Sequence, residues 1–170
     1  NGEALRTEQG YPIRLVVPGW EGNLWVKWLR RIEVGDKPWY THEETSKYTM
    51  LMSDGRARKF TFIMDAKSVV TNPSPEAPLL AKGRNVLSGL AWSGRGTIAR
   101  VDVTLDGGKN WREARIDGPV LDKSLTRFYV DFDWKGEELM IQSRAHDSTG
   151  YVQPTKDELR AVRGLNNIYH

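Results

Sequence analysis

Cysteine is absent from this chain of 170 residues. Disulfides, thiolate metal ligands and a cysteine nucleophile are therefore excluded within it, although the redox compartment stays open. The few histidines, His42, His146 and His170, lie far apart without a zinc-binding spacing, which argues against an autonomous zinc site. No apolar run approaches the roughly 20 residues that cross a bilayer, so we expect no membrane-spanning segment.

A strong charge of one sign is also lacking. The net charge is +3 and the sequence pI is about 9.2, with the basic residues spread along the chain. This is too weak to indicate a nucleic-acid partner. Hydrophobic residues make up 39% of the chain and include seven tryptophans, which is enough for one domain, or for one domain and a piece of another. No Ser-His-Asp set and no phosphate-binding glycine loop is present.

Alternating apolar residues predict short β-strands from about residue 59 to residue 151. The stretch "TIARVDVTL" (97–105) alternates throughout, and "DGGKN" (106–110) then predicts a hairpin turn. Three more sets alternate in the same way: Val86, Ser88, Leu90 and Trp92; Phe128, Val130, Phe132 and Trp134; Leu139, Ile141, Ser143 and Ala145. Short strands with frequent turns predict a mainly β fold, an antiparallel immunoglobulin-like β-sandwich.

One helix is expected near the end of the chain. Thr155 followed by Glu158 is a capping-box pattern, and Gly164 is a typical terminator. Arg163 would then be a cation at the helix C-terminus. Upstream, the proline-rich residues 72–78 predict a stiff connector between strands.

The first fifty residues differ from the rest. Residues 12–17 and 23–34 read as two strands joined by a turn, but so short a segment cannot bury a core and must pack on something else. Two interpretations of its cations stay open. Lys27, flanked by large apolar residues, extends its ammonium to solvent, or Arg14 and Lys27 converge on a phosphate or another anion.

Longer motifs carry a family resemblance. The stretches "QGYPIRLVVPGWEGNLWVKWLRRI", "EETSKYT", "GLAWSGRGTIARVDVTLDGGKNWREA", "DSTGYVQPT" and "RGLNNIYH" resemble the molybdenum-dependent sulfite oxidase family over essentially the whole chain. Within that family the chain is most similar to the sulfane dehydrogenase branch of the bacterial Sox sulfur-oxidation system. The resemblance implies a molybdenum-molybdopterin cofactor.

The resemblance also implies a domain organisation. Residues 1–48 would be the C-terminal part of the molybdopterin-binding domain, and residues 49–170 an immunoglobulin-like dimerisation domain that forms a homodimer. In this family a cysteine further upstream binds the molybdenum. Because the chain has no cysteine, we expect it to be a C-terminal fragment of a longer enzyme, without metal ligands of its own.

Roles for single residues follow from the same motifs. Tyr48 matches an active-site tyrosine that hydrogen-bonds beside the metal, and Arg163 matches an arginine of the positively charged substrate pocket. Gln9 stands where the sulfite oxidase branch has histidine. Glutamine can still donate a hydrogen bond to the cofactor but cannot be charged, which weakens the expectation of sulfite as substrate. Five residues are expected to bind or line the cofactor: Gln9, Arg14, Trp25, Val26 and Lys27.

The expected function is oxidation of reduced sulfur, either sulfane sulfur or sulfite. By resemblance, electrons would pass to a c-type cytochrome subunit, the substrate would be a sulfur oxyanion or a protein-bound sulfane, and the location would be periplasmic. The alternative is that this chain alone is a non-catalytic β-sandwich module for dimerisation, with no activity of its own.

Overall fold

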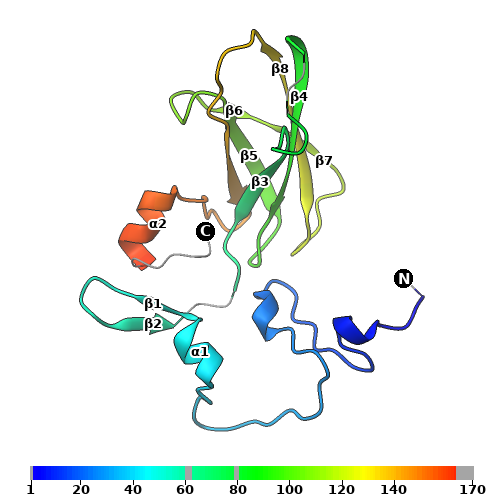
Figure 1. Ribbon diagram of the computed structural model, residues 1–170, viewed down its shortest axis with the longest axis vertical. Helices are drawn as coiled ribbons and strands as arrows, with labels where there is room; N and C mark the ends of the chain where they lie inside the picture. Colours follow the sequence, from blue (N-terminus) through cyan, green and yellow to red (C-terminus); the bar gives the residue numbers. More distant parts are fainter. Residues whose placement is uncertain (1, 60–62, 79–80, 164–170) are drawn as a thin grey trace. The chain divides into compact units, whose positions relative to one another are not determined.

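The computed structural model describes residues 2–59, 63–78 and 81–163, and the chain divides into two compact units (Figure 1). We call residues 64–154 the central unit, and residues 1–63 together with 155–170 the terminal unit.

The central unit is built from two antiparallel sheets. One sheet has the strand order β3-β4-β8-β7 and the other the order β6-β5-β9. The strands are β3 (Lys67–Asn72), β4 (Gly83–Trp92), β5 (Ile98–Thr104), β6 (Arg112–Glu113), β7 (Arg115–Asp117), β8 (Thr126–Trp134) and β9 (Gln142–Asp147). Strands β4 and β8 run side by side along their whole length (Figure 1). The predicted immunoglobulin-like sandwich is thereby confirmed.

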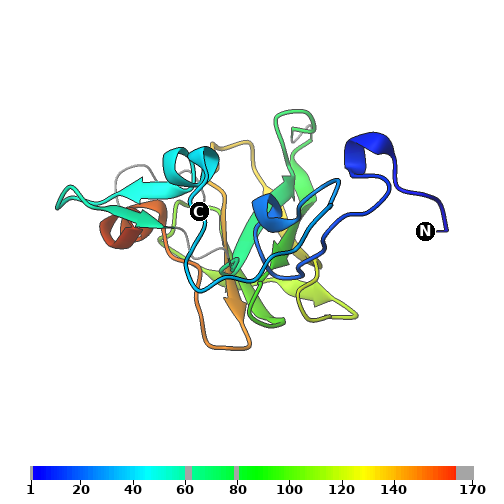
Figure 2. The same ribbon diagram turned by 90° about the horizontal axis from the view of Figure 1, so that it is seen from below.

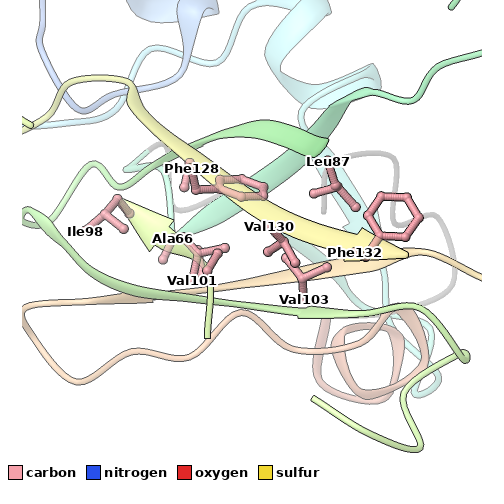
Figure 3. Packing of buried hydrophobic residues seen from close by; sticks show 11 residues of the cluster. Ala66, Leu87, Ile98, Val101, Val103, Phe128, Val130 and Phe132 are labelled. Carbon is pink, nitrogen blue, oxygen red and sulfur yellow. The ribbon is translucent and has the colours of Figure 1, made fainter. Parts of the chain in front are cut away.

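The core lies between these sheets and consists of the inward side chains of each strand (Figure 3). Phe128 and Leu87 come from one sheet and Val101 and Val103 from the other, and all four are fully buried. Each such side chain contributes about 1.5–3 kcal/mol through removal of its apolar surface from water. The alternation predicted for β8 and for residues 101–105 therefore gives the correct inward faces, whereas at the irregularity between Ile98 and Arg100 Ile98 is buried and Ala99 is exposed.

The inward face of β4 is opposite to the one that its bulky residues suggest. Leu87 and Ala91 are fully buried, whereas Val86 is 45% exposed. A side chain at Gly89 would overlap the ring of Phe128 and the carbonyl oxygen of Val69. The strand thus carries small residues inward because β8 packs closely against it, and Val86, Ser88, Leu90 and Trp92 form its outer face.

The predicted hairpin turn at 106–110 is confirmed. The Asp106 carboxylate accepts hydrogen bonds from the Asn110 backbone N–H at 2.9 Å and from the Thr104 hydroxyl at 2.7 Å. Gly107 and Gly108 have φ of 74° and 96°, a region that glycine adopts without strain. This turn sends the chain back to β6, which pairs with β5.

The terminal unit contains short elements. They are the 3₁₀ turns η1 (Thr7–Gln9) and η2 (Gly22–Leu24), helices α1 (His42–Ser46) and α2 (Lys156–Arg163), and strands β1 (Thr49–Leu51) and β2 (Ala57–Lys59). Strands β1 and β2 form an antiparallel hairpin (Figure 2). The predicted capping box of α2 is present, because Thr155 N–H donates to Glu158 at 2.8 Å and Glu158 N–H donates to the Thr155 hydroxyl at 3.3 Å. Gly164, the predicted terminator, lies outside the described residues.

The prediction of two strands at 12–17 and 23–34 is wrong. Residues 23–24 belong to the turn η2, and only two backbone bonds join the two segments, from Leu15 N–H to the Val26 oxygen at 2.9 Å and from Leu29 N–H to the Ile13 oxygen at 3.0 Å. Trp28 has φ of 52°, in the left-handed region, which interrupts the pleat that a strand requires. The apolar residues of these segments alternate as in a strand, but no continuous ladder of backbone hydrogen bonds stabilises a strand there.

Candidate cofactor-binding site

The first part of the candidate site is the tight turn that ends η1. Gly10 has φ of 109°, and its N–H donates to the Thr7 oxygen at 3.0 Å. A Cβ added at Gly10 would lie 3.1 Å from both Cα and Cβ of Lys27. Glycine is required here on two grounds, the backbone conformation and the close approach of Lys27.

Three side chains donate to three successive carbonyl oxygens of this turn. Trp28 Nε1 donates to the Thr7 oxygen at 3.0 Å, and Lys27 Nζ donates to the Glu8 oxygen at 2.6 Å. Arg14 donates to the Gln9 oxygen at 3.3 Å. The structure therefore brings Gln9, Arg14 and Lys27 into one group, and we call these three residues the cation cluster.

Tryptophan rings lie beside both cations. The Arg14 guanidinium is 5.8 Å from the centre of the Trp25 ring, and the Lys27 ammonium is 5.9 Å from the centre of the Trp28 ring. Trp25 is itself oriented, because its indole N–H donates to the Trp20 oxygen at 3.1 Å. Such contacts contribute on the order of 0.5–1 kcal/mol each at exposed sites. Val26, between the two tryptophans, is exposed.

The cation cluster has unused donors. Arg14 Nε is buried and has no hydrogen-bond partner, although a buried unsatisfied donor typically costs about 1–3 kcal/mol. The Lys27 ammonium has three protons and donates one to Glu8. An oxygen-rich, anionic group would satisfy both donors through charge-assisted hydrogen bonds. Lys27 is exposed, and its ammonium also donates to the Glu8 oxygen, so both interpretations of Lys27 stay predictions.

Tyr48 and Arg163 occupy other parts of the terminal unit. Tyr48 is half-buried in the turn between α1 and β1. Arg163 is the last residue of α2, whose C-terminal end is tied to β2 by a bond from Arg58 to the Val162 oxygen at 3.3 Å. The Arg163 side chain lies outside the described part of the chain, so its assignment remains a prediction.

A second polar cluster, which the sequence did not predict, lies on the outer face of the β6-β5-β9 sheet. Asp102, only 4% exposed, accepts hydrogen bonds at one carboxylate oxygen from Arg100 at 3.0 Å and from Arg144 at 2.9 Å, and His146 Nε2 lies 2.8 Å from that oxygen. The Arg144 guanidinium also lies 4.2 Å from the centre of the Trp111 ring. The sequence could have indicated this cluster only through the strand register, because Asp102 of β5 pairs with Arg144 of β9.

Burial and hydrogen bonding act on the pKa of Asp102 in opposite directions. Burial favours the neutral acid and raises the pKa, but the bonds from Arg144, His146 and Arg100 favour the carboxylate, and the net pKa is below the ordinary value. His146 contacts Asp102 rather than its neighbour Asp147, which instead accepts a bond from Ser93 at 2.7 Å.

Among residues 2–59, 63–78 and 81–163, no group of three or more His, Asp or Glu side chains is placed to hold a metal ion. In the same described residues, no helix has the length and apolar character needed to cross a bilayer.

Two family models place the chain among the molybdenum-cofactor oxidoreductases. Residues 58–170 match the family described as Mo-co oxidoreductase dimerisation domain, and residues 1–43 match the one described as oxidoreductase molybdopterin binding domain. The chain belongs to the sulfite oxidase family of molybdopterin-dependent oxidoreductases.

Relatives cover the whole chain. Mitochondrial sulfite oxidase of Homo sapiens is 34% identical over 186 residues, spanning 100% of this chain and 34% of that protein. The NADH nitrate reductase of Hordeum vulgare is 29% identical, spanning 99% of this chain and 21% of that protein. The crystal structure of the sulfane dehydrogenase SoxCD from Paracoccus pantotrophus superposes with a TM-score of 0.93 at 68% identity, and covers 100% of this chain and 44% of that one.

The comparisons confirm the predicted family and the predicted match to a molybdopterin-binding domain. The chain spans less than half the length of each of these relatives. The cation cluster lies within the segment that matches the molybdopterin-binding domain, and its unused donors fit a cofactor rich in oxygen and charge. Homodimer formation agrees with the dimerisation domain that residues 58–170 match.

Proposed function

We propose that this chain is the C-terminal part of a molybdenum-cofactor oxidoreductase that oxidises reduced sulfur. The substrate would be sulfane sulfur, free or protein-bound, or sulfite, and electrons would pass to a c-type cytochrome subunit in the periplasm. Full-chain similarity to a sulfane dehydrogenase at 68% identity supports the sulfur substrate. Immunodetection after cell fractionation tests the location.

The observation that carries this proposal is the buried, unpartnered Nε of Arg14 beside Lys27. A cation with an unsatisfied buried donor is stabilised by an anionic ligand more than by water. The bonds from Lys27 and Trp28 to the η1 turn orient this side of the cluster before any ligand binds. Less ordering is then required on binding, which favours affinity.

Each proposed residue has a distinct role. Arg14 and Lys27 bind polar groups of the pterin cofactor, Gln9 adds a neutral hydrogen bond, and Trp25 and Val26 line it. Tyr48 provides a hydrogen bond next to the reacting centre, and Arg163 holds the negatively charged substrate. The bound molybdenum supplies the two-electron redox chemistry. Because Gln9 cannot be charged, the pocket is less cationic than one with a protonated histidine, which favours sulfane sulfur over sulfite as substrate.

A non-catalytic dimerisation module is the second candidate function for the chain alone. The hydrophobic core belongs entirely to the central unit, and the chain has no cysteine to bind molybdenum as the family does. Molybdenum content and pterin fluorescence of the purified chain distinguish the enzyme function from the non-catalytic module. Stoichiometric cofactor bound to this chain would contradict the module interpretation.

Cofactor occupancy tests the residue roles in the enzyme that contains this chain. We expect Lys27→Ala to lower occupancy about tenfold, because it removes a charge-assisted bond of roughly 1.5–3 kcal/mol. Arg31→Ala is the matched control, since Arg31 is exposed and pairs only with Glu33 among the ion pairs of the described residues. Arg163→Met should keep the cofactor and weaken substrate binding. Unchanged occupancy in Lys27→Ala, or lost occupancy in Arg163→Met, would overturn the assigned roles.

A further inference from the structure

A pocket of about 440 Å³ lies entirely within the central unit. Its lining comes from two segments that are far apart in the sequence, residues 73–78 after β3 and residues 134–141 around the end of β8. Three prolines of the first segment, Pro73, Pro75 and Pro78, take part, and we call this hollow the proline pocket. Its volume is in the range of sites that bind small molecules, roughly 300–1,000 Å³.

One wall of the proline pocket is held in place by the hydrophobic core. Trp134, Leu139 and Ile141 line the pocket and also pack against the core between the two sheets. The indole N–H of Trp134 donates to the Glu137 oxygen at 2.8 Å, which orients the ring. This aromatic wall is therefore formed before any ligand binds, and little has to be ordered on binding.

The wall formed by the prolines is rigid for a different reason. Ser74 and Ala77 exchange backbone bonds, from Ser74 N–H to the Ala77 oxygen at 3.1 Å and from Ala77 N–H to the Ser74 oxygen at 3.0 Å. Each proline ring also fixes its own φ, so this backbone has little remaining freedom. The Ser74 hydroxyl donates to the Glu76 carboxylate at 3.1 Å, so its proton is already used within the chain.

The charged side chains of the lining have one sign. Among the described residues that line the proline pocket, only Glu137 and Glu138 are charged, and both are exposed. The Glu137 carboxylate is oriented, because it accepts the Lys135 backbone N–H at 3.0 Å. Lys82 does not line the pocket but lies against Gly136, where an added Cβ would be 2.8 Å from its ammonium. The lining thus combines apolar walls with two carboxylates.

We propose that the proline pocket binds a small organic cation, a free trimethylammonium compound. The Trp134 ring attracts a cation to its face, the prolines contact its methyl groups, and Glu137 and Glu138 compensate its charge. The Trp134 N–H and the Ser74 O–H are both used within the chain, which favours a ligand held by charge and apolar contact over one held by directional bonds. A sulfur oxyanion or a phosphate would be repelled by the same carboxylates, so this site does not depend on the proposed function.

Titration of the isotope-labelled chain with choline, followed by proton–nitrogen NMR spectra, tests the proposal. Neohexyl alcohol is the matched neutral ligand, because a carbon atom replaces the charged nitrogen and the shape is kept. We expect choline to shift the Trp134 indole signal, which is assigned by its loss in Trp134→Phe, and to bind at least tenfold more tightly than the alcohol. Equal affinities, or no shift of this signal with choline, would overturn the proposal.

Removal of the two negative charges tests their role. The double variant Glu137→Gln with Glu138→Gln should raise the choline dissociation constant about tenfold and leave that of neohexyl alcohol unchanged. An amide oxygen at position 137 can still accept the Lys135 N–H, so the turn keeps this bond. Glu113→Gln is the matched control, because Glu113 is an exposed residue of the central unit that does not line the pocket. An equal loss in the control, or no loss in the double variant, would refute the role of the carboxylates.

Phosphatidylcholine vesicles distinguish a free ligand from a lipid headgroup. The headgroup carries the same trimethylammonium beside a phosphate, which Glu137 and Glu138 would repel. We therefore expect the chain to stay in the supernatant when such vesicles are sedimented. Co-sedimentation that choline competes away would assign the pocket to a membrane surface and overturn the free ligand.

Discussion

Asp102 shows how a single residue on the outside of a sheet becomes buried. It lies on the outer face of β5, yet Arg100, Arg144 and His146 cover it, and all three contact one carboxylate oxygen. A buried carboxylate is stable only when its charge is compensated, which is why its pKa is lowered despite burial. These contacts join β5 to β9 on the outer face of the sheet, while the hydrophobic core packs against its inner face.

Replacement of this carboxylate by an amide should destabilise the central unit in a pH-dependent way. At pH 7, Asp102→Asn should lower the free energy of unfolding by about 1–3 kcal/mol, because charged donors lose an ionic acceptor. The lowered pKa means that the carboxylate stabilises the fold above the ordinary value of 3.8 and that this contribution is lost as pH falls through the folded-state pKa. Urea unfolding from pH 7 to pH 2 measures both effects.

The difference between wild type and Asp102→Asn should therefore shrink below about pH 4. Asp122→Asn is the control, because Asp122 is an exposed residue of the central unit that pairs with neighbouring Lys123. A difference that stays constant down to pH 2 would contradict a stabilising ionised Asp102.

Among the elements, α2 has the most local determinants. Its capping box satisfies two N-terminal donors through Thr155 and Glu158, and these bonds need no partner from elsewhere in the chain. The helix matters for function in our proposal because Arg163 is its last residue. A frayed first turn would loosen the whole element that positions this side chain.

Thr155→Ala should lower the stability of α2 by about 1 kcal/mol, because both the hydroxyl acceptor of Glu158 N–H and the side-chain bond between the two residues are lost. Hydrogen exchange of the Glu158 amide is the measurement, and its rate should rise about fivefold. Lys156→Ala, an exposed change one residue further on, should leave that rate unaltered. An equal increase in both variants would show that general fraying, not the cap, is responsible.

At the scale of the whole molecule, the two units differ in how much apolar surface they bury. The central unit contains the hydrophobic core, whereas among the described residues of the terminal unit only Gly10, Gly19 and Leu159 are buried. A unit with so small a core gains little from the hydrophobic effect. Many of its large apolar side chains, including Trp28 and Trp39, are exposed.

Amide hydrogen exchange on this chain should therefore separate the units. The amides of Phe128 and Val130 in the centre of β8 should exchange at least 100-fold more slowly than that of Leu15, although Leu15 N–H is also hydrogen-bonded. Similar protection for all three would contradict the difference in stability.

Several features followed from the sequence alone because their causes are local. The hairpin at 106–110, the capping box of α2 and the alternation in β5 and β8 depend on residues within a few positions of one another. The family motifs likewise predicted a shared role for Arg14 and Lys27, whose side chains both donate to carbonyl oxygens of the η1 turn. Such patterns determine which element forms, and often which of its faces is apolar.

Only the tertiary structure decided the rest, because those features depend on what packs against each element. Leu87 rather than Val86 faces inward, since the ring of Phe128 fills the space beside Gly89. Asp102 becomes buried and paired with Arg144 when β5 and β9 align. The segments around Arg14 and Lys27 alternate like strands, yet they do not form strands. The left-handed backbone of Trp28 and the bond from its side chain to the Thr7 oxygen hold the cation cluster against the η1 turn instead. Periodicity reports the side chains of one segment, while burial and ion pairing are set by neighbours distant in the chain.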